Sequence, residues 1–135
     1  MNNKLVGWSD ICELGIEEID LQHHYFLNLI IRLEKELGNT DDHVYKQALF
    51  TELGLYTHFH FVSEENLMYR EKYPELAKHK EHHESLIDGL NRSKLRFEKE
   101  QIEAVEVIEF LYHWFVQHTM GEDRKFAEFL GGAKA

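Results

Sequence analysis

Seven side chains of the kinds that bind metal ions are distributed over four segments of this 135-residue chain. They are His23, His60, Glu64, His79, His83, His118 and Asp123. His60 with Glu64, and His79 with His83, are i,i+4 pairs, which lie one turn apart on the same face of an α-helix. Together the imidazoles and carboxylates form a mixed nitrogen and oxygen ligand set. Such a set suits two metal ions that share the carboxylates, and it suits iron well.

The last two of these residues, His118 and Asp123, have a different spacing. On a helix with 3.6 residues per turn they lie about 140° apart, so they can bind one metal only where the helix loosens. Gly121 lies between them and permits a π-type turn or a helix end at this point.

Each candidate group also has an ordinary structural explanation. A single inward histidine such as His23 can be a hydrogen-bonded core residue, and the pair His60 and Glu64 can be a contact on a helix surface. The complete set favours metal, because an ionised carboxylate in a helical core needs a cation or a partner. The ligand types alone leave iron, manganese and zinc open.

The remaining histidines are not predicted to be ligands. His82 lies on the flank of its helix, next to a candidate ligand. The others fall outside the apolar faces of their helices and are expected to face solvent. These are His24, His43, His58 and His113.

Four amphipathic stretches position the candidate ligands, and each stretch carries them among its apolar positions. We predict helices over about residues 17–37, 42–69 and 75–98, and a fourth that begins near residue 102. Their short connections predict an all-α fold, an antiparallel up-down-up-down four-helix bundle.

Local signals mark the ends of these helices. Gly38 and Asn39 are typical of a C-terminal cap, and Asp41 or Asp42 can cap the second helix. Pro74 separates the second helix from the third. An irregular N-terminal arm (residues 1–16) and a short helical tail (residues 124–130) are expected to flank the bundle.

Composition limits the kinds of protein this chain can be. Its length predicts a single domain over residues 1–135, and 43% hydrophobic residues with one proline favour a globular, helical fold. A formal net charge of -10 disfavours binding to nucleic acid or anionic lipid. No apolar run reaches the roughly 18 residues that span a bilayer. The N-terminal residues lack an apolar signal run and Cys12 is the only cysteine, so we expect a cytoplasmic protein.

Other familiar metal and catalytic motifs do not occur. No histidine follows a glutamate by three positions, as in ferritin-like di-iron bundles. The chain has no His-Glu-x-x-His sequence of the kind found in zinc proteases, and no glycine-rich phosphate loop.

The candidate ligands and their neighbours resemble the motifs of the hemerythrin family, and more closely those of its bacterial branch. The resemblance covers roughly residues 8–130. The matching elements are Trp8, Gly15-Ile16, Ile19-Asp20-Leu21-Gln22-His23, His60-Phe61-Val62-Ser63-Glu64-Glu65 with Met68, His79-Lys80-Glu81-His82-His83, Trp114-Phe115-Val116-Gln117-His118, and Asp123.

The resemblance implies reversible O2 binding at a non-haem di-iron centre with an oxo or hydroxo bridge, for oxygen storage or delivery and without enzymatic activity. One iron would be held by His79, His83 and His118. The other would be held by His23 and His60 and would keep an open site, while Glu64 and Asp123 would bridge the two. The residues expected to line the O2 pocket are Phe26, Phe61, Trp114, Phe115 and Thr119.

Three alternatives remain open at this stage. The domain could be an O2 or redox sensor that changes its contacts with a partner. It could be a di-iron enzyme, such as a peroxidase or a nitric-oxide-handling protein. It could also store iron.

Two residues depart from the family pattern. The residue after the last histidine is usually apolar and is Thr119 here, whose hydroxyl could donate to a bound ligand, admit water, or bond back to a helix carbonyl. Three residues after the bridging aspartate the family tends to have tyrosine, and here it is Phe126. A supporting hydrogen bond is then either missing or supplied by another group.

Overall fold

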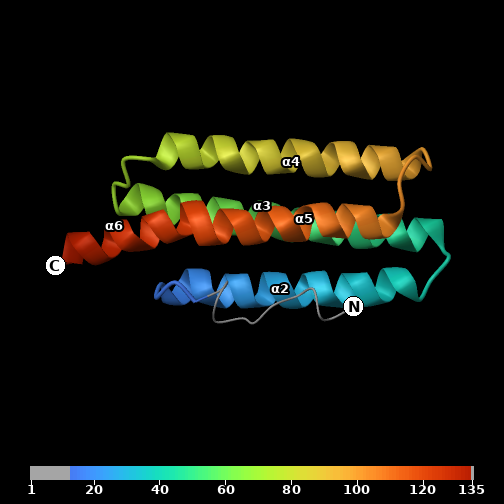
Figure 1. The fold of residues 1–135 in the computed structure, drawn as a ribbon, viewed down its shortest axis with the longest axis horizontal. Helices are drawn as coiled ribbons and strands as arrows, with labels where there is room; N and C mark the ends of the chain where they lie inside the picture. The colour runs from blue at the N-terminus through green and yellow to red at the C-terminus, as the bar shows by residue number, and fades with distance from the viewer. Residues whose placement is uncertain (1–12, 135) are drawn as a thin grey trace.

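A computed structural model describes residues 13–134 of the chain, and the surroundings of the side chains up to residue 131. Its elements are α2 (Glu17–Gly38), α3 (His43–Arg70), α4 (Leu76–Glu98), α5 (Ala104–His118), the π-helical turn η2 (Thr119–Asp123) and α6 (Arg124–Lys134). No β-strand occurs in residues 13–134. The four long helices run alternately in opposite directions (Figure 1), which confirms the predicted all-α up-down-up-down bundle.

The four long helices begin, and the first three of them end, within two residues of their predicted limits. Such differences are usual, because the ends of helices fray. Asp42, and not Asp41, caps α3: its carboxylate accepts hydrogen bonds from the backbone N–H groups of Val44 and Tyr45. The first turn of α2 is acidic, which suits the positive end of a helix dipole. Lys72, in the connection before Pro74, has a φ of 59° and turns the chain out of α3.

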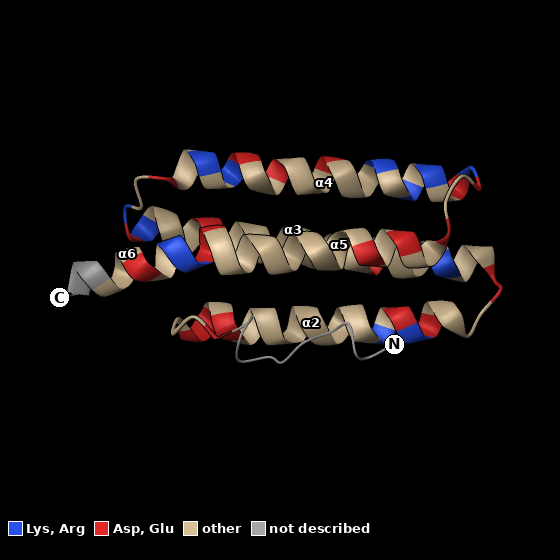
Figure 2. Cartoon of the chain, viewed as in Figure 1, with Lys and Arg blue, Asp and Glu red and all other residues tan. Residues whose placement is uncertain are grey.

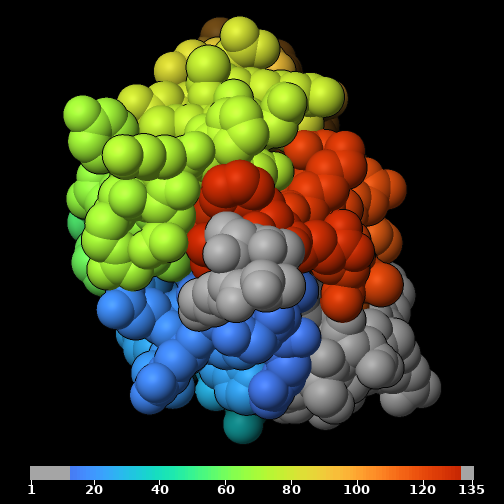
Figure 3. Space-filling view, turned by 90° about the vertical axis from the view of Figure 1, so that its left-hand side faces the viewer, coloured from blue at the N-terminus to red at the C-terminus, as the bar shows by residue number. Residues whose placement is uncertain are grey.

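The predicted tail forms α6, which is longer than expected and continues to Lys134. It lies over one end of the bundle, between the α3–α4 connection and the start of α2 (Figure 3). Residues 13–16 are irregular, as predicted, whereas Trp8 and Cys12 lie outside the described residues.

The apolar core has two parts with a polar layer between them. In α2 the order along the helix is Ile19 in the smaller cluster, then His23, then Phe26 in the larger cluster. In α3 the order is reversed, with Phe61 in the larger cluster, then Glu64, then Leu67. Because neighbouring helices are antiparallel, these polar residues meet at the same level of the bundle.

None of the helices in the described part of the chain is long and apolar enough to span a membrane.

Candidate metal centre

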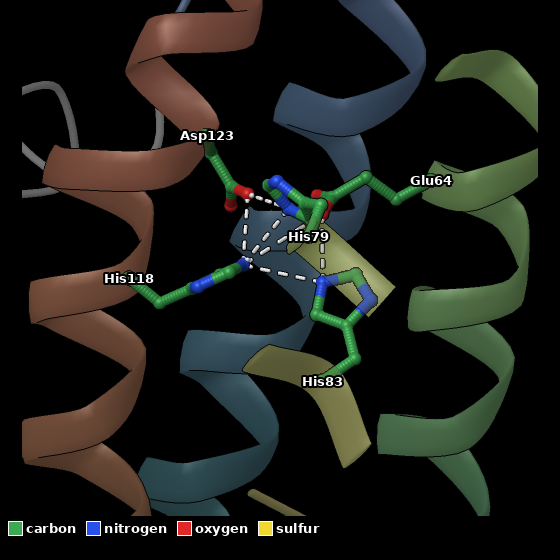
Figure 4. A group of neighbouring side chains, drawn as sticks. All are labelled: Glu64, His79, His83, His118 and Asp123. Carbon is green, nitrogen blue, oxygen red and sulfur yellow. Dashed lines mark hydrogen bonds and ion pairs between the residues drawn. The ribbon is translucent and has the colours of Figure 1, made fainter. Parts of the chain in front are cut away.

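All seven candidate ligands are buried in the polar layer. They form two groups that share both carboxylates, and in each group one ligand atom per residue lies within 4.8 Å of the others. The first group comprises Glu64, His79, His83, His118 and Asp123. The second comprises His23, His60, Glu64 and Asp123. Figure 4 shows the first group, whose side chains point toward one another from different helices. The structure therefore brings together every residue selected from the spacing, and their binding of metal stays a prediction.

The π-helical turn explains how His118 and Asp123 can belong to one site. A π-turn contains more residues than an α-helical turn, so residues five apart come onto one face. The structure forms this turn at Thr119–Asp123, around Gly121, where the sequence permitted it. As a result, His118 Nε2 lies 3.1 Å from Asp123 Oδ1.

Each carboxylate turns one oxygen toward each group of histidines. Glu64 Oε1 lies 2.8 Å from His79 Nε2 and 3.0 Å from His83 Nε2. The other oxygen of Glu64, Oε2, lies 3.5 Å from His60 Nε2 and 3.8 Å from His23 Nε2.

Asp123 repeats this division. Its Oδ1 lies 3.0 Å from His79 Nε2, and its Oδ2 lies 3.2 Å from His23 Nε2. A carboxylate that presents one oxygen to each of two ligand groups has the arrangement needed to bridge two cations.

Several buried polar atoms of the second group are left without a hydrogen-bond partner in the described structure. They are both ring nitrogens of His23, Oε2 of Glu64 and Oδ2 of Asp123. A buried acceptor without a partner is costly, and buried charges in proteins are normally paired or bound to metal. A cation between these atoms would satisfy His23 Nε2 and both oxygens at once, so the residues present fit a metal ion.

The carboxylates control the protonation of three of the histidines. Burial alone lowers the pKa of His23, but the close negative charges of Asp123 and Glu64 outweigh burial and raise it to about 9. The same opposition raises the pKa of His79 and of His118 to about 9.

His60 and the carboxylates respond differently. Burial dominates at His60 and lowers its pKa to about 4. Burial alone would raise the pKa of Glu64, but the four histidines close to its oxygens, His118, His23, His79 and His83, hold it well below its usual range. The pKa of Asp123 is also strongly lowered: His118 and His23 outweigh burial and the nearby charge of Glu64. In the metal-free protein both carboxylates are therefore ionised and three of the histidines hold protons, so a metal ion that binds here must displace those protons.

Two residues that were not singled out as site residues hold the outer nitrogens of candidate ligands. Glu65 Oε2 lies 2.7 Å from Nδ1 of His83, and Gln22 Oε1 lies 2.8 Å from Nδ1 of His60. The amide nitrogen of Gln22 in turn donates to Oγ of Ser63 at 2.8 Å. An acceptor at Nδ1 fixes the tautomer and orients Nε2, which here faces the shared carboxylates. The available signal was position: each residue lies next to a candidate ligand in the sequence.

The predicted pocket aromatics divide between the two sides of the centre. Phe115 contacts His23, with ring centroids 5.4 Å apart, and Phe26 contacts His60 at 5.8 Å. On the other side, Phe61 stacks on His83 at 3.7 Å.

Trp114 lies with Phe61 on the three-histidine side, where it stacks on His118 with ring centroids 4.3 Å apart. Phe61 also reaches His60, at 5.9 Å. Of the predicted pocket aromatics, Phe26 and Phe115 therefore lie on the two-histidine side, where Tyr56 also stacks on His60 with ring centroids 6.5 Å apart.

The two departures from the family pattern have distinct surroundings. Thr119 is buried, and its hydroxyl has no hydrogen-bond partner in the described structure, so a bond back to a helix carbonyl is not formed. Phe126 is buried in the smaller apolar cluster, with its ring 4.9 Å from that of Tyr73.

Two surface crevices reach the three-histidine side. One of about 380 Å³ is lined in part by Phe61, Glu65 and His83. The other, of about 250 Å³, is lined in part by Trp114 and His118.

The remaining histidines lie outside both ligand groups. His82 is half-buried, with Nδ1 3.9 Å from Glu122. His24, which was expected to face solvent, is also half-buried, with Nε2 3.4 Å from Glu13. The other three are exposed to solvent, as predicted. They are His43, His58 and His113.

The chain is similar to several known proteins. The family model described as "Hemerythrin HHE cation binding domain" matches residues 14–130. The chain is 30% identical over 124 residues to a bacteriohemerythrin of Stenotrophomonas maltophilia (strain R551-3), covering 92% of this chain and 80% of that protein. It is 27% identical over 127 residues to a bacteriohemerythrin of Clostridium acetobutylicum, covering 90% and 98% of the two chains. A crystal structure of wild-type hemerythrin has the same fold, with a TM-score of 0.81 at 22% identity, over 92% of this chain and 96% of that one.

Proposed function

Since the chain belongs to the hemerythrin family, we propose that its buried centre binds two iron ions and that the loaded centre binds O2 reversibly. The observation that carries the proposal is the division of the two carboxylates, each with one oxygen toward each histidine group. A pair of iron ions supplies the two electrons that O2 takes up on binding and returns on release.

The two ligand groups are unequal in size, which supports different roles for the two irons. His79, His83 and His118 would hold one iron together with the shared carboxylates. His23 and His60 would hold the other, so this iron has one protein ligand fewer. The iron on the two-histidine side would therefore have room for a small ligand.

The surroundings of the two-histidine side suit a small apolar ligand. His23 is fully buried, and the rings of Phe26 and Phe115 lie against each other with centroids 4.9 Å apart beside the two histidines. Apolar walls of this kind exclude water, while a diatomic gas carries no hydrogen bonds that it must lose on entry. Phe61 and Trp114 have a different role in this proposal, since they pack on ligand rings of the other iron and fix their orientation.

We propose storage or delivery of O2 in preference to catalysis. Both crevices described above approach the centre on the three-histidine side, where the protein would already supply five ligands. A larger substrate in either crevice would meet the outer faces of ligand rings, away from the free position. Steady-state turnover of hydrogen peroxide by the iron-loaded protein at an enzymatic rate would contradict this preference.

Anaerobic reconstitution tests the proposal directly. Purified metal-free protein is loaded with Fe(II), desalted, analysed for iron, and followed by absorbance during exposure to air and then to argon. We expect two irons per chain, with an absorbance band that appears in air and is lost under argon. Glu84→Ala, which removes an exposed carboxylate near the centre, should behave like the unchanged protein. One iron or none in a folded sample, or a change in air that argon does not reverse, would refute the proposal.

A further inference from the structure

The exposed face of α3 carries a line of uncharged residues along the whole helix. On a helix with 3.6 residues per turn, its members fall within about 80° of one another. They lie opposite the buried face that carries Leu53 and His60. Six of them are Val44, Thr51, Leu55, Phe59, Val62 and Tyr69, all exposed.

This line is unusual for the outermost part of a bundle helix. The outward face of such a helix is normally polar or charged. Here Val44, Leu55 and Tyr69 are 74%, 68% and 77% exposed, and Phe59 is 55% exposed. Ala48 and Asn66 complete the line, so no charged residue occurs within it.

The charge-free surface continues onto α2. Residues 21–31 of α2 and residues 53–63 of α3 contain no Lys, Arg, Asp or Glu, although such residues make up 30% of the chain. The ring of Tyr25, exposed on α2, lies 4.7 Å from that of Tyr56 on α3 and joins the two surfaces. In Figure 2 the middle of α2 is tan, whereas α4 carries both signs of charge along its length.

We propose that this face binds a second copy of the same chain, with the two α3 helices packed antiparallel. In an antiparallel pair related by a twofold axis, positions whose numbers have a constant sum lie opposite each other. In one such register, the numbers of the two facing residues add up to 113 or 114, and every member of the line then has a partner in the line of the second copy. It places Leu55 opposite Phe59 of the second copy, Thr51 opposite Val62, Ala48 opposite Asn66, and Val44 opposite Tyr69. The largest apolar pair, Leu55 with Phe59, then occurs twice at the centre.

The spacing and the charges both favour a copy of the chain as the partner. The line advances in steps of three and four residues, which is the spacing of a helix that packs along another helix. From Val44 to Tyr69 it extends about 38 Å at 1.5 Å per residue. In this register Glu65 lies beside Gln47 of the second copy, so it opposes no like charge. The chain carries a net charge of -10, and this uncharged face lets two copies meet without opposing carboxylates.

Sedimentation of the iron-loaded full chain tests this inference. We expect a mass twice the 16.1 kDa of one chain, and stronger association at higher salt, because salt screens the repulsion between acidic copies. Phe59→Glu should weaken association by roughly tenfold or more, since it places a charge at the centre of each half of the interface. Phe110→Glu is the matched control: it makes the same change at an exposed aromatic residue on α5 and should remain a dimer. Circular dichroism and iron content check that both variants are folded.

Crosslinking tests the register independently. In a Cys12→Ser background, a mixture of Thr51→Cys and Val62→Cys proteins should give a crosslinked dimer with a short bis-maleimide, whereas neither protein alone should. Crosslinking of Thr51→Cys with itself would indicate a parallel pair and overturn the register. A monomeric wild-type protein, or a dimer that survives Phe59→Glu, would overturn the proposal. A monomer that instead binds vesicles of zwitterionic lipid through this face would overturn it in favour of a membrane surface.

Discussion

Replacement of Glu65 by alanine should weaken metal binding although it removes none of the seven candidate ligands. The carboxylate of Glu65 lies 2.7 Å from Nδ1 of His83, whose Nε2 then faces Glu64 at 3.0 Å. Without Glu65, the Nδ1–H group of a side chain that is only 2% exposed loses its acceptor. The ring of His83 can then adopt the other tautomer, in which Nε2 carries the proton and cannot bind a metal.

Two independent estimates give the size of this effect. An unsatisfied buried donor costs about 1–3 kcal/mol, and about 1.4 kcal/mol corresponds to tenfold in affinity. Loss of the outer partner of a metal-binding histidine typically weakens metal binding about 10–100-fold. Because Glu65 is itself 21% exposed, water can replace part of the lost interaction. We therefore expect a loss near the lower limit, about tenfold.

A competition titration measures the loss. Metal-free protein and a chromophoric chelator compete anaerobically for Fe(II), and the affinity for each iron is fitted. Glu65→Gln should give a smaller loss, because an amide oxygen still accepts from Nδ1 but carries no charge. Glu84→Ala removes a carboxylate from the same crevice and should bind iron normally. Unchanged affinity in Glu65→Ala, or an equal loss in Glu84→Ala, would show that Glu65 does not act through His83.

Four other outcomes follow from the same centre. Fe(II) should raise the melting temperature, because a ligand at 1,000 times its Kd stabilises the native state by about 4 kcal/mol; coincident melts would contradict this. Glu64→Ala should lose one or both irons, and a variant with two irons and normal spectra would show that Glu64 is not a bridge. Thr119→Val should stabilise the metal-free protein by up to about 1 kcal/mol, since it removes a buried hydroxyl without a partner, and should slow autoxidation; a less stable variant with faster decay would contradict both. The pKa values of His23, His79 and His118, about 9, lie above the reference value of 6.5. Their stabilisation is complete below pH 6.5 and is lost as the pH rises through 9, so urea denaturation of the metal-free protein at rising pH should show a falling free energy of unfolding.

Most of the fold was predictable because it depends on local patterns. The apolar spacing of three and four residues identified the four long helices, and Pro74 marked the break between the second and third. The choice between Asp41 and Asp42 as a cap was not predictable, since it depends on a one-residue difference in where the chain turns. The length of α6 was underestimated because the helix continues through Gly131 and Gly132, which have a low helix propensity.

The candidate ligands were predictable for the same reason, whereas their outer partners were not. The spacing of residues along one helix shows which side chains face the core, and the seven candidate ligands were selected on this basis. Whether Glu65 meets His83, or Gln22 meets His60, depends on how α4 and α2 are rotated about their axes against α3. Single-helix periodicity does not specify that rotation. The same unknown rotation explains why the sequence did not predict which pocket aromatics lie on which side of the centre.

The residues that accept hydrogen bonds from the outer nitrogens of the ligand histidines also differ in charge between the two ligand groups. Behind His83 lies the anionic carboxylate of Glu65, and behind His60 lies the neutral amide of Gln22. A carboxylate at Nδ1 makes an imidazole a stronger donor than an amide does. The three-histidine iron would therefore have both more ligands and a stronger donor, which favours firm retention. An iron held by His23 and His60 would have fewer ligands, a weaker outer partner and aromatic walls, all of which would favour exchange of a small ligand. The same pair of bridging carboxylates can thus join an iron suited to holding the centre together and an iron suited to reaction.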